Sequence, residues 1–278
     1  MMVVLKWAGV ALLVYVLYVS VIVMTQRNFM YFPFGSKRPN IYLSGGMDVI
    51  TVTTDDGLEL EAWYDPPTED GKPVIIMFHG NGQSIAYRPP KVQHFREQGY
   101  GALLAEYRGY GGNPGKTTEE GVYKDARAYL NWLINDQNIA ADNIILYGES
   151  LGSGVAVQMA TEYDVKAVLL DVPFNSALAV AQSHFFVVPF LEYLMWDQYR
   201  SDLKIKNINA PVFIGLAGSD MVVRPHFGRA LYELAVEPKQ MKEYPDSGHM
   251  DLHHHGFPQD AVAFIESLDN EEKQETAE

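Results

Sequence analysis

Gly148-Glu149-Ser150-Leu151-Gly152 decides the fold, because of what precedes and follows it in the chain. Residues 143–147 form a short apolar run typical of a buried strand, and residues 153–160 are small and compatible with a helix. A serine at the apex of a tight turn between a strand and a helix is the arrangement of a nucleophile elbow. The flanking glycines allow close packing around the turn, and a helix N-terminus favours developing negative charge. The stretch therefore predicts a nucleophilic Ser150.

A serine nucleophile needs a base and an orienting acid, which in this architecture follow in the order serine, acid, histidine. Residues 211–216 are typical of a buried strand, and Asp220 follows at its carboxyl end, on the ligand side of a parallel sheet. Residues 240–244 predict another strand, with His249 in the loop after it. We therefore predict Asp220 as the acid and His249 as the base. Asp171 is an alternative acid that fits the chain order less well, and it is expected instead to bond loop backbone near the pocket.

The negative charge of an acyl-transfer intermediate needs backbone N–H donors. One is expected from Leu151, which follows the nucleophile. The other is expected from the glycine-containing loop after a strand at residues 73–78, with the N–H of Asn81 as first choice and that of Gly82 as second. His79 in the same loop is expected to bond the loop backbone rather than to act as a second base.

These motifs in combination resemble the α/β-hydrolase superfamily and, more narrowly, its membrane-anchored α/β-hydrolase-domain proteins. The resemblance covers roughly residues 26–267 and also includes the motifs at residues 79–82, 106–111 and 218–220. Glu106 stands where the group usually has Asp, and Met250 stands where Asn is common, but neither belongs to the predicted triad. The resemblance implies a serine hydrolase of esters or thioesters and does not define the substrate.

The apolar run from Trp7 to Met24 has no charged residue. As a helix it would be about 27 Å long, close to the ~30 Å hydrocarbon core of a bilayer. We expect an uncleaved, single-pass membrane anchor; a secretory signal peptide and a buried core helix are the alternatives. Lys6 precedes the run, whereas Arg27, Lys37 and Arg38 follow it. This count weakly favours a cytoplasmic catalytic domain and leaves the side of the membrane open.

Composition fits one catalytic domain behind an anchor. We expect an anchor and juxtamembrane segment at residues 1–35, the catalytic domain at 36–268 and a solvated acidic tail at 269–278. The net charge of −14 argues against nucleic acid as a partner, and the absence of cysteine excludes disulfides and a thiol nucleophile. No cofactor and no metal are expected, because the adjacent residues 253–255, all histidines, would rarely present three nitrogens to one ion. The oligomeric state stays open.

The order of strands and helices predicts an α/β-hydrolase fold: a mostly parallel eight-stranded sheet with helices on both faces and a small cap, preceded by the transmembrane helix. Residues 47–53 and 58–64 flank a turn and predict a hairpin. Further strands are expected at residues 73–78, 101–105, 143–147, 166–170, 211–216 and 239–244, and the clearest helix at 119–135.

Residues 175–199 interrupt this alternation and are rich in large apolar side chains. They form either a plain crossover helix packed on the sheet or a small cap that lines an acyl pocket. In the second case Phe186 and Phe190 are expected to bind substrate.

The sequence thus predicts a membrane-anchored serine hydrolase that cleaves acyl esters or thioesters, including lipid-derived ones, through an acyl-enzyme. The alternatives are a serine peptidase or amidase with the same triad, and a non-catalytic, membrane-tethered binding module. The expected partners are a small-molecule or lipid acyl substrate and the membrane. Because the triad lies downstream, removal of residues 1–26 is expected to leave a soluble and active enzyme.

Overall fold

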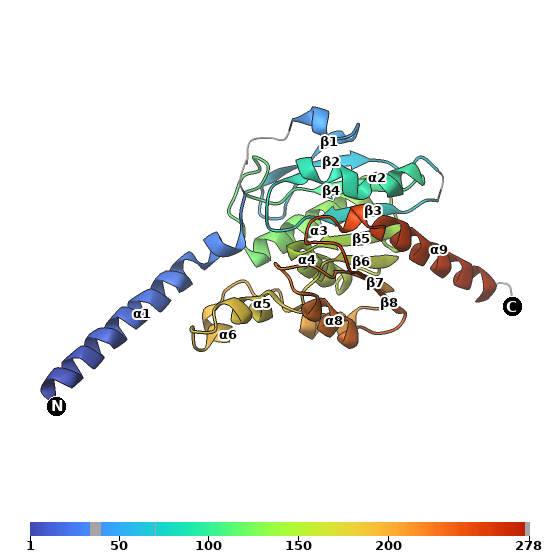
Figure 1. Ribbon diagram of the computed structural model, residues 1–278. Helices are drawn as coiled ribbons and strands as arrows, with labels where there is room; N and C mark the ends of the chain where they lie inside the picture. The colour runs from blue at the N-terminus through green and yellow to red at the C-terminus, as the bar shows by residue number, and fades with distance from the viewer. Residues whose placement is uncertain (34–39, 70, 276–278) are drawn as a thin grey trace.

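The computed structural model describes residues 1–33, 40–69 and 71–275. Within these ranges one sheet has the strand order β1-β2-β4-β3-β5-β6-β7-β8 (Figure 1). β1 pairs with β2 and β2 with β4 in antiparallel fashion, and all later pairs are parallel. The strands are β1 (Asp48–Thr53), β2 (Glu59–Asp65), β3 (Val74–Phe78), β4 (Gly101–Ala105), β5 (Ile144–Glu149), β6 (Ala167–Asp171), β7 (Val212–Ala217) and β8 (Lys239–Tyr244).

Helices cover both faces of the sheet, as the parallel strands require. The α-helices are α1 (Met2–Met30), α2 (Pro89–Glu97), α3 (Glu119–Asn135), α4 (Leu151–Ala160), α5 (Ala177–His184), α6 (Leu191–Leu194), α7 (Ser201–Lys204), α8 (Pro225–Leu234) and α9 (Phe257–Glu275). The short 3₁₀ helices are η1 (Ile41–Leu43), η2 (Ile85–Tyr87), η3 (Ala141–Asn143), η4 (Ile205–Asn207) and η5 (Leu252–His254).

Alternate residues of each central strand enter two different cores, because successive strand side chains point to opposite faces. In β3, Val74 and Ile76 belong to the core that also contains residues of α3, α4 and α8, whereas Ile75 and Met77 belong to the core that contains residues of α2 and α9. All five residues of β3 are buried. The continuous apolar runs in the sequence therefore arise from strands that are covered on both sides. The predicted fold class is confirmed, and each predicted strand agrees with the observed one within one or two residues.

Helix α1 projects away from the sheet and is long and apolar enough to cross a membrane (Figure 1). It is 29 residues long and so extends beyond the predicted apolar run at both ends. Within the described ranges it is the only helix that meets these criteria of length and composition.

Of the two predicted domain boundaries, one lies outside the described residues and the other falls within a continuous helix. The boundary between residues 35 and 36 lies outside the described residues, as do Lys37 and Arg38. At the other end, α9 continues as one helix through residue 269, where the acidic tail was expected to begin, and reaches Glu275. Glu, Lys and Gln are good helix formers, so the helix can continue after its apolar positions end.

Candidate active site

Ser150 lies at the turn between β5 and α4, in a backbone conformation that L-residues rarely adopt. Its φ is 50° and its ψ is −112°, and its N–H donates to the carbonyl oxygen of Asp171 at 2.9 Å. A non-glycine residue at positive φ is strained and persists only where its surroundings enforce it. Here a Cβ on Gly152 would overlap the carbonyl oxygen of Phe78, and one on Gly148 would overlap the backbone of Gly152. The two glycines thus permit the close approach of helix and strand that presents the Ser150 hydroxyl.

The structure brings Ser150, His249 and Asp220 into one hydrogen-bonded chain. The Ser150 Oγ lies 3.0 Å from His249 Nε2, and His249 Nδ1 lies 2.6 Å from Asp220 Oδ2. The other carboxylate oxygen of Asp220 accepts hydrogen bonds from the N–H groups of Val222 and Val223 at 2.7 and 2.9 Å. Because Asp220 acts as an acceptor throughout, His249 donates from Nδ1, and the lone pair on Nε2 faces the serine hydroxyl.

Asp171 does not contact His249. Its fully buried carboxylate accepts hydrogen bonds from Lys91 Nζ and from the Tyr147 hydroxyl, each at 2.8 Å. The expectation that this side chain bonds loop backbone is therefore wrong, since its partners are side chains of α2 and β5. Its main chain instead holds the Ser150 turn.

A buried charge cluster lies directly behind Ser150. Glu149, which precedes Ser150, forms ion pairs with Arg88 Nε at 2.6 Å and with Lys91 Nζ at 3.5 Å. Burial alone would raise the pKa of the Glu149 carboxyl, but Arg88 and Lys91 lower it to about 2. Arg88 also donates to the carbonyl oxygen of Gly82 at 3.2 Å, so the cluster connects the turn at Ser150 with the loop after β3.

His79 and Glu106 support the same loop from beneath. His79 Nδ1 lies 2.7 Å from the carbonyl oxygen of Gly80, so His79 bonds the loop backbone as predicted. Its Nε2 lies 3.0 Å from Glu106 Oε1. The other oxygen of Glu106 accepts from the N–H of Ile85 at 3.0 Å. In the sequence, Glu106 stands out only as a departure from the family pattern. Its role, like those of Arg88 and Lys91, depends on partners distant in the sequence.

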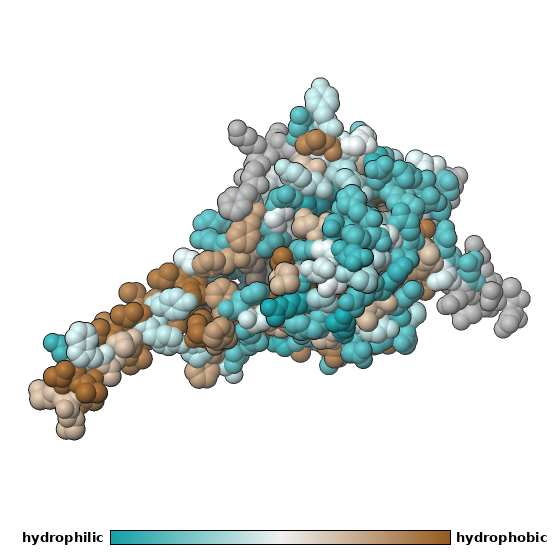
Figure 2. All heavy atoms as spheres, viewed as in Figure 1, coloured by the Kyte–Doolittle hydropathy of each residue, from teal (hydrophilic) through white to brown (hydrophobic). Residues whose placement is uncertain are grey.

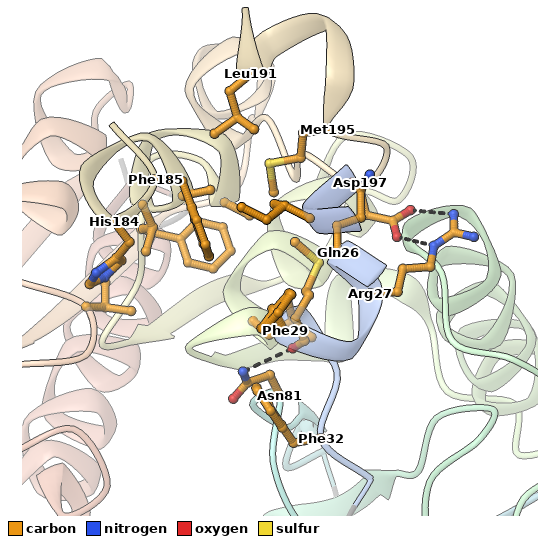
Figure 3. A pocket seen from close by; sticks show the side chains of 18 of the residues that line it. Gln26, Arg27, Phe29, Phe32, Asn81, His184, Phe185, Leu191, Met195 and Asp197 are labelled. Atoms are coloured by element: carbon orange, nitrogen blue, oxygen red, sulfur yellow. Dashed lines mark hydrogen bonds and ion pairs between the residues drawn. The ribbon is translucent and has the colours of Figure 1, made fainter. Parts of the chain in front are cut away.

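The loop after β3 carries Asn81 to the edge of the pocket that Ser150 faces. The Asn81 side chain donates to the carbonyl oxygen of Met30 at 3.0 Å (Figure 3), and its own carbonyl accepts from the Tyr110 hydroxyl at 2.7 Å. The backbone N–H groups of Asn81 and Leu151 have no acceptor in the part of the chain that the structure describes. Both residues line the pocket beside Ser150.

Gly82, the second choice for this role and a predicted substrate-binding residue, is placed differently. It pairs with Phe32 in an isolated β-bridge, its carbonyl accepts from Arg88, and it does not line the pocket. The loop turns away after Asn81 because Gly82 joins the segment that follows α1. Gly82 therefore holds the loop in place, and the prediction that it contacts substrate is not supported by its position.

The pocket at Ser150 has a volume of about 320 Å³ and predominantly apolar walls (Figure 3). One wall comes from the segment that includes α5 and α6, and the opposite wall comes from α1. The residues on the first wall include Val180, Ala181, Phe185, Leu191, Leu194 and Met195, and those on the second include Ile22, Val23, Gln26, Phe29 and Met30. From its composition α1 was expected to act only as an anchor, and its place in the pocket wall was not predicted.

Phe186 and Phe190 were predicted to face this pocket, and the structure contradicts that prediction. Their exposed fractions are 84% and 70%, and neither lines the pocket. The adjacent residues Phe185 and Leu191 face it instead, and the Phe185 ring lies 6.1 Å from that of Phe29. Neighbouring residues point in different directions in the irregular stretch between α5 and α6, so composition alone does not show which of them turns inward.

Comparisons with known proteins agree with this architecture. The family model for serine aminopeptidase, S33, matches residues 69–200. An uncharacterized protein of Mycobacterium tuberculosis is 37% identical over 229 residues, which cover 81% of either chain. The lysophosphatidylserine lipase ABHD12 of Danio rerio is 28% identical over 198 residues, 64% of this chain and 51% of that protein. The structure of an esterase from Pyrococcus furiosus superposes with a TM-score of 0.68 at 20% identity, covering 84% of this chain and 98% of the esterase.

The fold and the matched family define a serine hydrolase of the α/β type. The chain belongs to the α/β-hydrolase superfamily, as the resemblance in its motifs implied, and the proteins similar to it include human ABHD12B as well as the lipase of Danio rerio. The reading as a non-catalytic binding module is thereby replaced by that of an enzyme.

Proposed function

We propose that this protein is a membrane-anchored hydrolase of acyl esters or thioesters whose catalytic triad is Ser150, His249 and Asp220. The observation that carries the proposal is the continuous hydrogen-bonded chain from the Ser150 hydroxyl through His249 to the Asp220 carboxylate. The serine stands at the edge of an apolar pocket, where an acyl chain can lie beside the nucleophile.

In the proposed mechanism, Ser150 Oγ attacks the acyl carbonyl while His249 Nε2 accepts its proton. Asp220 holds the imidazole in the required tautomer and stabilises the imidazolium. The N–H groups of Asn81 and Leu151 donate to the developing oxyanion. His249 then protonates the leaving alcohol or thiol. Water, deprotonated by His249, hydrolyses the acyl-enzyme and regenerates Ser150.

Several features support a lipid-derived substrate. The pocket walls are mostly aliphatic and aromatic, and one of them belongs to α1, the helix proposed to span the membrane once. A relative named as a lysophosphatidylserine lipase acts on a substrate of this class. A site that shares a wall with its membrane anchor is well placed to receive an acyl chain from the bilayer.

A serine peptidase or amidase is the second candidate, favoured by the aminopeptidase description of the matched family. The same triad chemistry cleaves amides. A panel of p-nitrophenyl esters, acyl thioesters and aminoacyl amides distinguishes the two. Higher kcat/KM on aminoacyl amides than on any ester would replace the esterase proposal.

The assignment of the nucleophile is tested with a fluorophosphonate probe. We expect the wild-type protein to be labelled at one site, and Ser150→Ala to lose both labelling and ester hydrolysis while its circular dichroism stays unchanged. Ser153→Ala is the matched control, because Ser153 lies one helical turn from the nucleophile and bonds the Ser150 carbonyl with its hydroxyl. Labelling retained in Ser150→Ala at unchanged stoichiometry would place the nucleophile elsewhere.

A further inference from the structure

An exposed apolar surface covers the segment that forms the outer wall of the pocket. We call it the cap face; it consists of Phe186, Val187, Phe190, Tyr193 and Trp196. Phe186 and Tyr193 are more than four-fifths exposed. Clusters of large exposed apolar side chains mark contact surfaces for other proteins or for membranes. The cap face therefore needs an explanation beyond the packing of the segment on the pocket.

The cap face lies directly beside α1. The Tyr15 hydroxyl donates to the carbonyl oxygen of Val187 at 2.6 Å. Gln26 donates to the carbonyl oxygen of Leu194 at 3.1 Å and accepts from the N–H of Trp196 at 2.8 Å. Figure 2 shows hydrophobic side chains along α1 that continue onto the neighbouring surface, where Figure 1 places α5 and α6. The segment is thus attached to α1 at two levels, a lower one at Tyr15, near the middle of the helix, and an upper one at Gln26 and Arg27, near its C-terminal end.

These two levels lie at different depths along the helix axis. Twelve residues separate Tyr15 from Arg27, which corresponds to about 18 Å along an α-helix. One leaflet contributes about 15 Å of hydrocarbon. Tyr15 also lies near the middle of the uncharged run that starts at Trp7 and ends at Met24. If α1 spans the bilayer with this run, Val187 must lie within the hydrocarbon of one leaflet.

The upper level, at Arg27, has the residue types that are typical of a membrane–water interface. Arg27 forms an ion pair with Asp197 at 2.6 Å, and its guanidinium lies 5.0 Å from the centre of the Trp196 ring. Tryptophan and arginine at one level of a membrane helix are typical of the headgroup region. The only charged residue from 185 to 196 is Glu192. Its carbonyl oxygen accepts a hydrogen bond from the Gln198 side chain, which places Glu192 at the end of the segment near Arg27 and Asp197.

We infer that the cap face is a second membrane contact, which inserts into the same leaflet that surrounds the C-terminal half of α1. The inference rests on the proposed anchoring by α1. The bilayer is the one partner that fits, because the face is continuous with the anchor, lies at hydrocarbon depth and carries no charge among its five residues. The acyl pocket then opens between two elements that both lie in lipid, so an acyl chain can enter it without crossing water.

The test uses the full-length chain, which has no cysteine and so accepts single labels. Phe186→Cys and Phe190→Cys are labelled with an environment-sensitive fluorophore and reconstituted into phosphatidylcholine vesicles that contain lipids spin-labelled at graded acyl depths. Val14→Cys in α1 serves as the reference for hydrocarbon. Tyr42→Cys in η1 serves as the reference for water, because Tyr42 is exposed and η1 lies far from α6 in Figure 1.

We expect acyl-chain quenching at residues 186 and 190 that is comparable to that at residue 14, and none at residue 42. Quenching at 186 and 190 no greater than at 42, with strong quenching at 14, would overturn the cap contact and leave the anchor intact. Weak quenching at 14 would refute both the anchor and the cap contact. Fluorophosphonate labelling in the same vesicles reports separately on the proposed chemistry.

A functional variant tests the contact independently. Carboxylates are costly in hydrocarbon, so Phe186→Glu combined with Phe190→Glu should lower hydrolysis of 4-methylumbelliferyl oleate in vesicles by about tenfold or more. Hydrolysis of p-nitrophenyl butyrate in detergent should stay within about twofold of wild type, because neither residue lines the pocket. Tyr42→Glu is the matched control. Unchanged activity of the double variant on the vesicle-borne ester would overturn the inference.

Discussion

If the pocket at Ser150 holds the acyl chain as proposed, the enzyme prefers long acyl chains, and replacing Phe185 and Leu194 with alanine should flatten that preference. Both side chains line the pocket from the same wall, and both are only half-buried, so their loss should harm the fold less than the loss of a core residue. Phe186→Ala with Phe190→Ala is the matched control, since both residues belong to the same segment and are exposed.

The magnitude follows from the apolar surface that the substrate buries. Each methylene buried in the transition state contributes about 0.8 kcal/mol, or roughly fourfold in kcat/KM. Between a four-carbon and an eight-carbon ester, four methylenes give a ratio of about 250 if all are buried. If the variant leaves one side of the chain in water, the factor per methylene falls to about two, and the ratio to about 16. The expected loss of discrimination is therefore about fifteenfold.

The assay is kcat/KM on p-nitrophenyl esters of two to twelve carbons, in detergent micelles so that the bilayer does not contribute. We expect a flattened profile for the Phe185 and Leu194 variant and an unchanged profile for the control. Profiles that differ from wild type only by a constant factor would show that the pocket at Ser150 does not hold the acyl chain. A flattened profile in the control alone would refute the geometry of the pocket wall.

Asp220→Asn should lower kcat by about four orders of magnitude in a folded protein, because the amide favours the wrong histidine tautomer; Asp171→Asn should instead lower the melting temperature and leave a far smaller effect on kcat. Lys91→Met should cost about 3–5 kcal/mol of unfolding free energy in urea titrations, because it leaves two buried carboxylates with less positive charge. The pKa of Glu149 is lowered in the folded state from 4.5 to about 2, so the stability that its charge contributes should be complete above pH 4.5 and be lost as the pH falls towards 2. The measurement is the free energy of unfolding of the wild-type protein between pH 4.5 and pH 2. A free energy that stays constant across this window would contradict the assignment. Deleting residues 2–26 should leave fluorophosphonate labelling but reduce the preference for long esters, and a truncated enzyme with the wild-type chain-length profile would show that α1 contributes nothing to the pocket.

The predictions that agree with the structure rest on local patterns. The buried strands appear as short apolar runs, because both faces of the central sheet are covered. The turn at Ser150 is visible because glycines are needed at fixed positions around it. Asp220 and His249 could be proposed because parallel strands end at the same edge of the sheet, so that Ser150 and His249 lie side by side although 99 positions separate them in the chain.

The features that were missed depend on orientation or on distant partners. Phe185 and Phe186 are identical in type, and only the path of the chain after α5 decides that the first lines the pocket and the second does not. Arg88 and Lys91 look like ordinary surface residues before α2 is placed against β5, yet they neutralise the carboxylates behind Ser150. Hydropathy identifies such residues as exposed by default, because it does not record the ion pairs that permit burial.

The clearest departure concerns α1, where one stretch of sequence serves two purposes. Its composition predicts a membrane span, and the domain boundary predicted after residue 35 separates that span from the catalytic domain. In the structure, Ile22 and Val23 form part of the pocket wall, and Gln26 bonds the segment opposite. Apolar residues satisfy both demands equally, because a helix face meets lipid and an acyl chain through the same chemistry. If α1 spans the bilayer as proposed, its position there also sets the position of the pocket, and the active site is joined to the membrane rather than tethered near it.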